Sequence, residues 1–316
     1  MAIGLASPAS ATNYVVDGTL WSVMLGANHA FYQIGAGGDG DTPPFAAYAG
    51  DRMTLEFEDP ANPGVYLRPE CASPETATLE DDGDQLIDCN DPTPLLDGNL
   101  TWDGDIKIFS GDYQGLVGRL TYVMTNSGNS PLTLNMRYFV NTEECNSVVG
   151  NVATSSGDLV ASEADSWLLC NNLNEALEGI VWGNNFAELV TDNALTPDPT
   201  GTDIYYIFND GVVLDPAQTA TFVFYLHSEG ATDHGATLGD TDEAITSNMN
   251  TYFDLSTLGS SRLWEGLTSA DNWSLTAPSA EEPLADTGFD SSGLAVAGFA
   301  LAGLGVAMFA RRRAQT

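Results

Sequence analysis

The stretch Leu120-Thr-Tyr-Val-Met-Thr-Asn-Ser-Gly-Asn-Ser-Pro-Leu-Thr-Leu-Asn-Met-Arg-Tyr-Phe-Val140 decides the fold class. Large apolar residues occupy every second position on both sides of a segment rich in Asn, Ser, Gly and Pro. Successive side chains of a strand point to opposite faces, so this alternation gives each segment one apolar face. We therefore expect an antiparallel hairpin of strands 120–125 and 132–140, turning at Asn126–Pro131, with one face buried.

Similar apolar segments recur between residues 14 and 230, separated by Gly, Asp, Asn and Pro. The clearest is Ile204–Phe208, which we expect to turn at Asn209–Gly211, continue to Leu214 and be followed by a long strand, Thr219–His227. Weaker strand signals lie at 14–25, 53–58, 65–67, 106–109 and 180–190.

Helical spacing is rare in this sequence. Asp240–Glu243 has the pattern of a capping box, and the apolar residues after it predict a helix to about Leu255. A short helix is also predicted near 165–177. Many short strands and few short helices predict an all-β fold, specifically an antiparallel β-sandwich of Ig-like or jelly-roll type.

The charge of the chain is strongly acidic. Its 316 residues include 44 Asp and Glu against 9 Lys and Arg, for a net charge of −35. Such a surface repels nucleic acid and attracts divalent cations, so we exclude nucleic acid as a partner. A salt-adapted or high-GC host would produce the same excess of acids without any functional acidic face.

The C-terminal region carries three signals in a fixed order: Leu284-Ala-Asp-Thr-Gly288, an uncharged apolar run at 293–310, and the basic tail Arg311–Arg313. At about 1.5 Å per residue the apolar run is long enough to cross most of a bilayer core of roughly 30 Å. We expect a C-terminal transmembrane helix with the arginines on the cytoplasmic side. The residues before it would then lie outside the cell.

This arrangement resembles the sorting signal of Gram-positive surface proteins, whose usual pentapeptide is LPxTG. The LAxTG form resembles the variant handled by actinobacterial class E sortases. The resemblance implies that a sortase recognises Leu284, Ala285, Asp286, Thr287 and Gly288 and that its cysteine thiolate attacks the Thr287 carbonyl. Gly288 then leaves, and an amine of peptidoglycan takes Thr287. The alternative is a plain single-pass membrane anchor without cleavage.

The remaining domain boundaries follow from export. Residues 1–11 end in Ala9-Ser-Ala11, a pattern suited to signal peptidase, so we interpret them as a truncated signal peptide with Thr12 as the mature start. Residues 12–276 form the extracellular β-region, as one large or two closely packed domains. Residues 277–283 form a short linker, and 284–316 form the sorting signal.

Four cysteines are an even set in an exported chain, so disulfides are expected. Nested and crossed pairings remain open, but the sequential pairs Cys71–Cys89 and Cys145–Cys170 close the shortest loops. Each would stabilise the fold by about 3 kcal/mol on the chain-entropy estimate.

An acidic segment, Glu80–Asp91, is the best candidate for a metal site. Carboxylates at its first, third, fifth, ninth and twelfth positions suit a hard cation that takes six to eight oxygen ligands. The segment resembles the calcium loops of thrombospondin type 3 repeats, which implies Glu80, Asp82, Asp84, Asp88 and Asp91 as ligands of one structural calcium ion. The alternative is a solvated acidic loop. No other cofactor is predicted.

Catalysis has little support in the sequence. The three histidines lie in no zinc-protease motif, and there is no G-x-S-x-G elbow. We expect no enzyme, but a structural or interaction role for a protein held on the cell wall. The alternatives are a carbohydrate- or protein-binding adhesin with exposed Trp residues, a minor pilin that uses the only lysine, Lys107, and a glycosidase with paired carboxylates.

Overall fold

The computed structural model describes 15 stretches of the chain. They are residues 12–15, 21–25, 34–36, 53–70, 76–89, 92–113, 117–142, 151–157, 162, 164–171, 177–184, 188–191, 203–229, 242–267 and 270–273. The chain divides into two units, Met1–Leu275 and Thr276–Thr316, and all of these stretches belong to the first.

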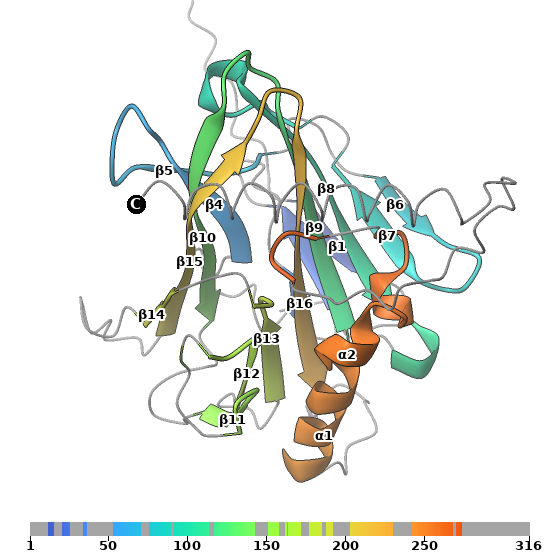
Figure 1. Cartoon of the computed structure of the whole chain (residues 1–316). Helices are drawn as coiled ribbons and strands as arrows, with labels where there is room; N and C mark the ends of the chain where they lie inside the picture. Colours follow the sequence, from blue (N-terminus) through green and yellow to red (C-terminus); the bar gives the residue numbers. More distant parts are fainter. Residues whose placement is uncertain are drawn as a thin grey trace, which may run out of the picture. The chain divides into compact units, whose positions relative to one another are not determined.

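An eight-stranded antiparallel sheet is the larger element of this unit (Figure 1). Its strands in spatial order are β11 (Asn151–Thr154), β12 (Trp167–Asn171), β13 (Leu177–Val181), β16 (Thr219–Glu229), β9 (Val117–Asn126), β8 (Leu100–Phe109), β7 (Gln85–Asp88) and β6 (Thr76–Leu79).

Two further antiparallel sheets are formed by the other strands. A five-stranded sheet contains, in order, β14 (Glu188–Thr191), β15 (Asp203–Leu214), β10 (Leu132–Thr142), β4 (Met53–Glu58) and β5 (Tyr66–Leu67). A three-stranded sheet contains β1 (Thr12–Val15), β2 (Trp21–Leu25) and β3 (Ile34–Ala36). The prediction of a mainly β, antiparallel fold with few helices is confirmed.

The eight-stranded and five-stranded sheets share one apolar core. Tyr122 and Phe224 come from the larger sheet, Phe57 and Tyr138 from the smaller one, and all four side chains are fully buried. The rings of Tyr138 and Phe224 stack across the interface with centroids 3.8 Å apart and planes 12° apart. The predicted alternation of apolar residues therefore identifies the inner faces of both sheets correctly.

The predicted hairpin of 120–125 and 132–140 is wrong in its pairing. β9 pairs with β8 and β16, whereas β10 pairs with β4 and β15, so the two strands belong to different sheets. Their apolar faces pack against each other in the shared core. Alternation specifies which face of a strand is buried but not which strand lies beside it, and both arrangements satisfy the pattern.

Asn126 fixes the crossing from one sheet to the other. Its buried side chain donates to the carbonyls of Ser130 (2.9 Å) and Leu214 (2.8 Å) and accepts from the Gly128 N–H (2.9 Å). Its main chain also bonds to the neighbouring β15–β16 connection, through Ala217 and Gln218. The two crossings thus lie side by side, at the end of β9 and the start of β16 (Figure 1).

The predicted turn at Asn209–Gly211 is a β-bulge instead. β15 runs without interruption from Asp203 to Leu214, and its register against β10 shifts at this point. Gly211 has φ +77, a conformation that glycine adopts without strain, and its N–H contacts the Asn135 side chain (3.2 Å). A Gly in the left-handed conformation suits a bulge as well as a turn, which is why the local signal misleads.

A second apolar cluster covers the outer face of the eight-stranded sheet. It is closed by helices α1 (Asp242–Tyr252) and α2 (Leu255–Leu258) and by the 3₁₀ turn Arg262–Trp264 (Figure 1). The helix predicted after Asp240 is confirmed as α1, whose Ile245 and Met249 are buried in this cluster.

The helix predicted near 165–177 is wrong, because β12 occupies Trp167–Asn171. Leu168 faces the core between the sheets, whereas Trp167 and Leu169 face the outer cluster. With both faces buried, the strand shows no period-two pattern.

Candidate functional site

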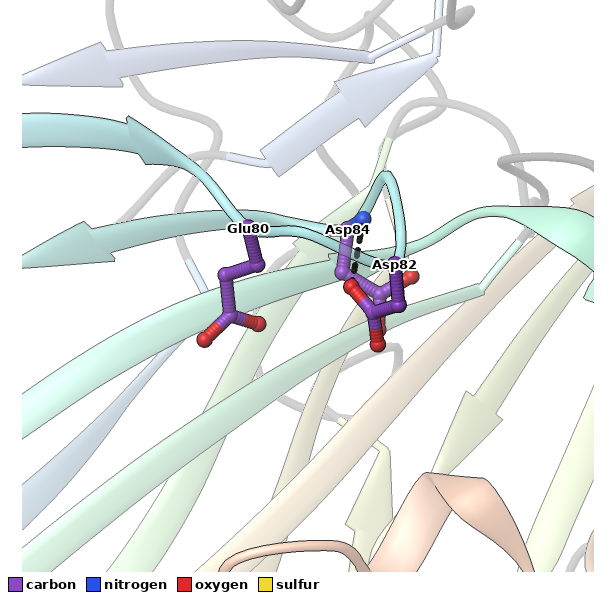
Figure 2. Close-up of side chains that lie close together, drawn as sticks. All are labelled: Glu80, Asp82 and Asp84. Carbon is purple, nitrogen blue, oxygen red and sulfur yellow. Dashed lines mark hydrogen bonds between the residues drawn. The ribbon is translucent and has the colours of Figure 1, made fainter.

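The acidic segment forms a tight turn between β6 and β7. Gly83, with φ +89, donates its N–H to the Glu80 carbonyl (3.0 Å), and the Glu80 N–H bonds to the Asp84 carbonyl (2.8 Å). The Asp84 N–H also contacts the Asp82 carboxylate (3.0 Å), shown by the dashed line in Figure 2. As a result, carboxylate oxygens of Glu80, Asp82 and Asp84 lie within 4.8 Å of one another.

Two basic side chains contact these three acids directly. Lys107 Nζ lies 2.7 Å from Glu80 Oε2 and 3.3 Å from Asp84 Oδ2. Arg262 pairs with Asp84 Oδ1 and lies 3.4 Å from Asp82 Oδ2. We call these five residues, Glu80, Asp82, Asp84, Lys107 and Arg262, the ion-pair cluster.

Asp84 is the centre of the ion-pair cluster, and its side chain is fully buried. Besides its two cations, its Oδ1 accepts from the Ser110 N–H (2.8 Å) and from the Ser110 hydroxyl (3.1 Å). A buried carboxylate requires this degree of compensation, since removal of a charge from water costs several kcal/mol. The cluster therefore ties three distant parts of the chain together: the β6–β7 turn, β8 and the segment after α2.

The pKa of Lys107 reflects the same pairing. Burial alone would lower this pKa, but the hydrogen bond and charge of Glu80, together with Asp84, raise it above its ordinary value. The pKa of Asp82 is lowered, chiefly by the Asp84 N–H. Lys107 is thus held as a buried ammonium ion, with 6% of its surface exposed.

The five predicted calcium ligands are only partly brought together. Glu80, Asp82 and Asp84 meet, whereas Asp88 lies in β7, opposite Asp105 of β8. Asp91 is outside the described residues. The three acids that meet also contact Lys107 and Arg262, so a calcium ion at this turn would compete with two cations of the chain. The calcium site stays a prediction.

A groove of about 550 Å³ lies beside the ion-pair cluster on the outer face of β7, β8 and β9. Its lining, which we call the β8–β9 groove, consists of Glu80, Asp81, Asp82, Leu86, Asp105, Lys107, Arg119, Thr121, Val123, Glu265, Gly266 and Leu267. Sequence reasoning missed Asp105, Arg119, Thr121 and Glu265. Asp105 and Thr121 are cross-strand neighbours, as are Lys107 and Arg119, a relation that only the strand register reveals.

Asp105 has the most perturbed carboxyl group of the groove. Burial raises its pKa to about 6, despite the opposing charge of Arg119 and the nearby Thr121 hydroxyl. Asp88 and Asp103 on the same face raise this pKa further. Its pairing with Arg119 is loose, at 4.0 Å between Oδ1 and Nη2.

Arg119 is buried under the segment that follows α2. Its Nη1 donates to the carbonyls of Leu263 (3.0 Å) and Glu265 (2.8 Å). The Tyr225 hydroxyl donates to the same Leu263 carbonyl (2.9 Å). These bonds fix residues 263–267 as one wall of the β8–β9 groove.

Other residues singled out by the sequence are placed as follows. Five of the six Trp residues are described with their side chains, and all are buried: Trp102, Trp167, Trp182, Trp264 and Trp273. His227 is also buried, at the end of β16 against the Tyr252 ring. For these five tryptophans the core-packing interpretation is confirmed, and a sugar-stacking platform is excluded.

Cys89 is buried at the end of β7 and is disulfide-bonded. The pairings Cys71–Cys89 and Cys145–Cys170 stay predictions. The pentapeptide 284–288 and the apolar run 293–310 lie outside the described residues. Within the described stretches, no helix has the length and apolar character needed to cross a membrane.

Comparison with known proteins identifies no family. No protein-family profile matches the chain, and no curated protein matches it. Solved structures match only distantly. The Slr1438 protein from Synechocystis has 9% identity and a TM-score of 0.42, over 72% of this chain and 99% of that chain. Heparan sulfate lyase HepC from Pedobacter heparinus has 11% identity and a TM-score of 0.43, over 72% and 36% of the two chains.

A galactose mutarotase-like protein from Clostridium acetobutylicum is similar at the same level, with 8% identity, a TM-score of 0.39, and coverage of 69% of this chain and 94% of that chain. With TM-scores under 0.5, these likenesses carry no argument about activity.

Proposed function

We propose that this chain is an exported surface protein that a class E-type sortase attaches covalently to the peptidoglycan of a Gram-positive cell wall. The observation that carries this proposal is the order of LADTG (284–288), the apolar run 293–310 and Arg311–Arg313. The pentapeptide alone would be weak support. A pentapeptide directly before an apolar run and a basic tail is what a sorting signal requires and what a plain anchor does not need.

The proposed reaction is a transpeptidation at Thr287. The sortase thiolate attacks the Thr287 carbonyl, the Thr287–Gly288 peptide bond breaks, and the Gly288 amine leaves with a proton. An amine of the peptidoglycan cross-bridge then attacks the thioester, forms an amide with Thr287 and returns the thiolate. The apolar helix and the arginines hold the substrate at the membrane during this reaction.

In this proposal the folded region, residues 12–276, has a structural or interaction role. We assign it the β-sandwich architecture, of general Ig-like or jelly-roll type, which the apolar core shared by two antiparallel sheets supports. Each Lys and Arg side chain of the described residues lies within 4.0 Å of a carboxylate oxygen; these residues are Arg68, Lys107, Arg119, Arg137 and Arg262. Two of the acids that they contact, Glu56 and Asp84, are fully buried, so these ion pairs compensate a buried charge.

Two alternatives lose support from the described residues. A polymerising pilin needs an accessible acceptor amine, but Lys107 is buried and bonded to Glu80 and Asp84. A carbohydrate-binding surface built on exposed tryptophans lacks its aromatic row, since five Trp side chains are buried. A glycosidase would need a carboxylate pair. Asp88 and Asp105, which lie opposite each other on β7 and β8 and both have a raised pKa, are the features that favour it.

Replacement of Thr287 tests the proposed attachment. Thr287→Ala should move the protein from the wall fraction to the membrane fraction. Asp286→Ala is the matched control, because this position varies within the LAxTG pattern, and it should leave the protein in the wall. If Thr287→Ala leaves the distribution between the wall and membrane fractions unchanged, Thr287 is not the site of attachment and the sorting proposal is contradicted.

A further inference from the structure

β16 extends beyond the end of its neighbour β13. The two strands pair only between residues 225 and 229 of β16, whereas β16 begins at Thr219. Within the described residues, the part of β16 before Tyr225 therefore has no strand beside it on that side. Residues 270–273, Ala-Asp-Asn-Trp, bond to this uncovered edge, and we call them the 270–273 strap.

The strap satisfies the backbone of β16 as a neighbouring strand would. The Asp271 N–H donates to the Thr221 carbonyl (2.7 Å), and the Asp271 carboxylate accepts from the Thr221 N–H (3.0 Å). Asn272 acts through its side-chain amide, which accepts from the Val223 N–H (3.0 Å) and donates to the Val223 carbonyl. Trp273 donates its Nε1–H to the same carbonyl (2.8 Å). Buried peptide groups of β16 are thus paired without a strand.

The strap is bonded on its other side to the chain that leaves β13. Asn272 Nδ2 also donates to the Trp182 carbonyl (3.1 Å), and the Asn184 N–H donates to the Asn272 carbonyl (2.9 Å). Between them, Gly183 has φ +84, and a Cβ at this position would lie 2.2 Å from the Asn272 carbonyl oxygen. Glycine permits this close approach. Because Asn272 is fully buried, the strap is enclosed between β16 and the end of β13.

Trp273 fixes the end of the strap by packing. Its side chain is 4% exposed and lies in the outer apolar cluster, edge-to-face with Tyr225 (centroids 5.7 Å apart) and Trp264 (6.1 Å). It is also the last residue of the chain that the structure describes. Residues 274–283 separate it from Leu284, where the proposed sorting pentapeptide begins. Tension applied to the chain beyond the strap therefore reaches the described fold at Trp273.

The contacts of the strap are such that it cannot leave the sheet at low cost. Its removal would break the bonds of Asn272 on both sides at once. It would also leave peptide groups of Thr221 and Val223 without partners and expose the Trp273 ring to water. Unpaired peptide groups and an exposed apolar ring both cost free energy. We therefore expect the strap to separate from β16 only when the fold itself opens.

We propose that the 270–273 strap is the mechanical clamp of the fold, the segment that transfers tension on the C-terminus into the eight-stranded sheet. This inference rests on the proposed wall attachment, which makes the C-terminus the loaded end of the protein. Under tension the strap and the sheet should yield in one event, and the bonds of Asn272 should determine how long the folded state lasts.

The test is single-molecule magnetic tweezers at constant force on the full-length chain. One handle is attached through Val213→Cys, at an exposed position of β15, and the other at the C-terminus. Asn272→Ala should shorten the lifetime of the folded state about 10- to 100-fold, because it removes three side-chain hydrogen bonds of the strap. Trp273→Phe keeps the apolar ring and removes one bond, so it should shorten the lifetime about 3- to 10-fold. This milder variant keeps the test valid if Asn272→Ala does not fold.

A second loading geometry separates a clamp from general stabilisation. With handles at Val65→Cys and Val213→Cys, both exposed, the tension does not pass through the strap, and Trp273→Phe should match the lifetime of the protein with an intact strap. The proposal is overturned if Trp273→Phe shortens the lifetime equally in both geometries, or if it has no effect under C-terminal load. It is also overturned if the strap detaches in a separate extension step before the sheet opens. Wall fractionation of Thr287→Ala tests the attachment alone, and its failure leaves these lifetimes unchanged.

Discussion

Replacement of Asp105 by Asn should change how the stability of the protein depends on pH. Burial raises the pKa of Asp105 to about 6 in the folded chain, above its ordinary value of 3.8. The folded state therefore holds this proton more tightly than the unfolded state does. Between about pH 4 and pH 6 the unfolded chain loses the proton first, so the free energy of unfolding falls as pH rises through this window.

The size of this effect follows from the two pKa values. Each pKa unit corresponds to about 1.4 kcal/mol, so a rise from 3.8 to about 6 costs at most about 3 kcal/mol at neutral pH. The side chain is 25% exposed, which makes this an upper figure because solvent screens part of the charge. Asn cannot ionise. Relative to the wild type, Asp105→Asn should thus gain up to about 3 kcal/mol between about pH 4 and pH 7.

Urea unfolding followed by tryptophan fluorescence measures this difference, because five buried Trp residues report on the fold. The free energy of unfolding is determined for both proteins at several pH values between about 4 and 8. Asp215→Asn, at an exposed turn between β15 and β16, is the matched control and should follow the wild type at every pH. The reasoning is refuted if the curves of Asp105→Asn and the wild type stay parallel from about pH 4 to pH 7.

Three further outcomes test the remaining parts of the fold and the ion-pair cluster. Asp84→Ala should lower the free energy of unfolding by about 3–5 kcal/mol, because it leaves two cations without their buried partner. Asp81→Ala, at an exposed position of the same turn, should leave the free energy of unfolding unchanged. Equal urea midpoints for the two variants would contradict the stabilising role of the ion-pair cluster. Asn126→Ala should lower the free energy of unfolding by about 3 kcal/mol, because it removes the side-chain hydrogen bonds at the sheet crossing. Asn250→Ala, on the exposed side of α1, is the control and should change this free energy little. An Asn126→Ala variant as stable as the wild type would show that the crossing does not depend on these bonds. Millimolar Ca²⁺ should leave the melting temperature unchanged, because Lys107 and Arg262 already contact the acids of the turn. A clear rise in the melting temperature would support the calcium site instead.

The strands were largely predictable, but their neighbours were not. Alternation at 120–140 correctly identifies two strands and their buried faces, yet β9 and β10 lie in different sheets. The Asn-Asp-Gly sequence at 209–211 indicates a residue with positive φ, and Gly211 has this conformation in a β-bulge as it would in a turn. The short strand β12 was not predicted, because both of its faces are buried and its sequence therefore shows no alternation.

The candidate site shows a similar division between local and distant information. Glu80, Asp82 and Asp84 are close in sequence, so their convergence could be predicted. Arg262 joins them from 178 positions after Asp84, and no local pattern indicates that contact. From the sequence alone the acidic turn resembles a calcium loop, whereas in the folded chain Lys107 and Arg262 contact its carboxylates. The β8–β9 groove likewise depends on strand register.

The central claim is that the chain ends at Thr287 in an amide bond to peptidoglycan, and mass spectrometry of wall-released protein tests it most directly. After muramidase digestion of purified walls, the account predicts a C-terminal peptide that stops at Thr287 and carries the mass of a cross-bridge fragment. Peptides from residues 288–316 should be missing from this fraction and present in the membrane. Wall or membrane protein that retains an unbroken Thr287–Gly288 bond, with no Thr287-linked fragment in the digest, would contradict the account.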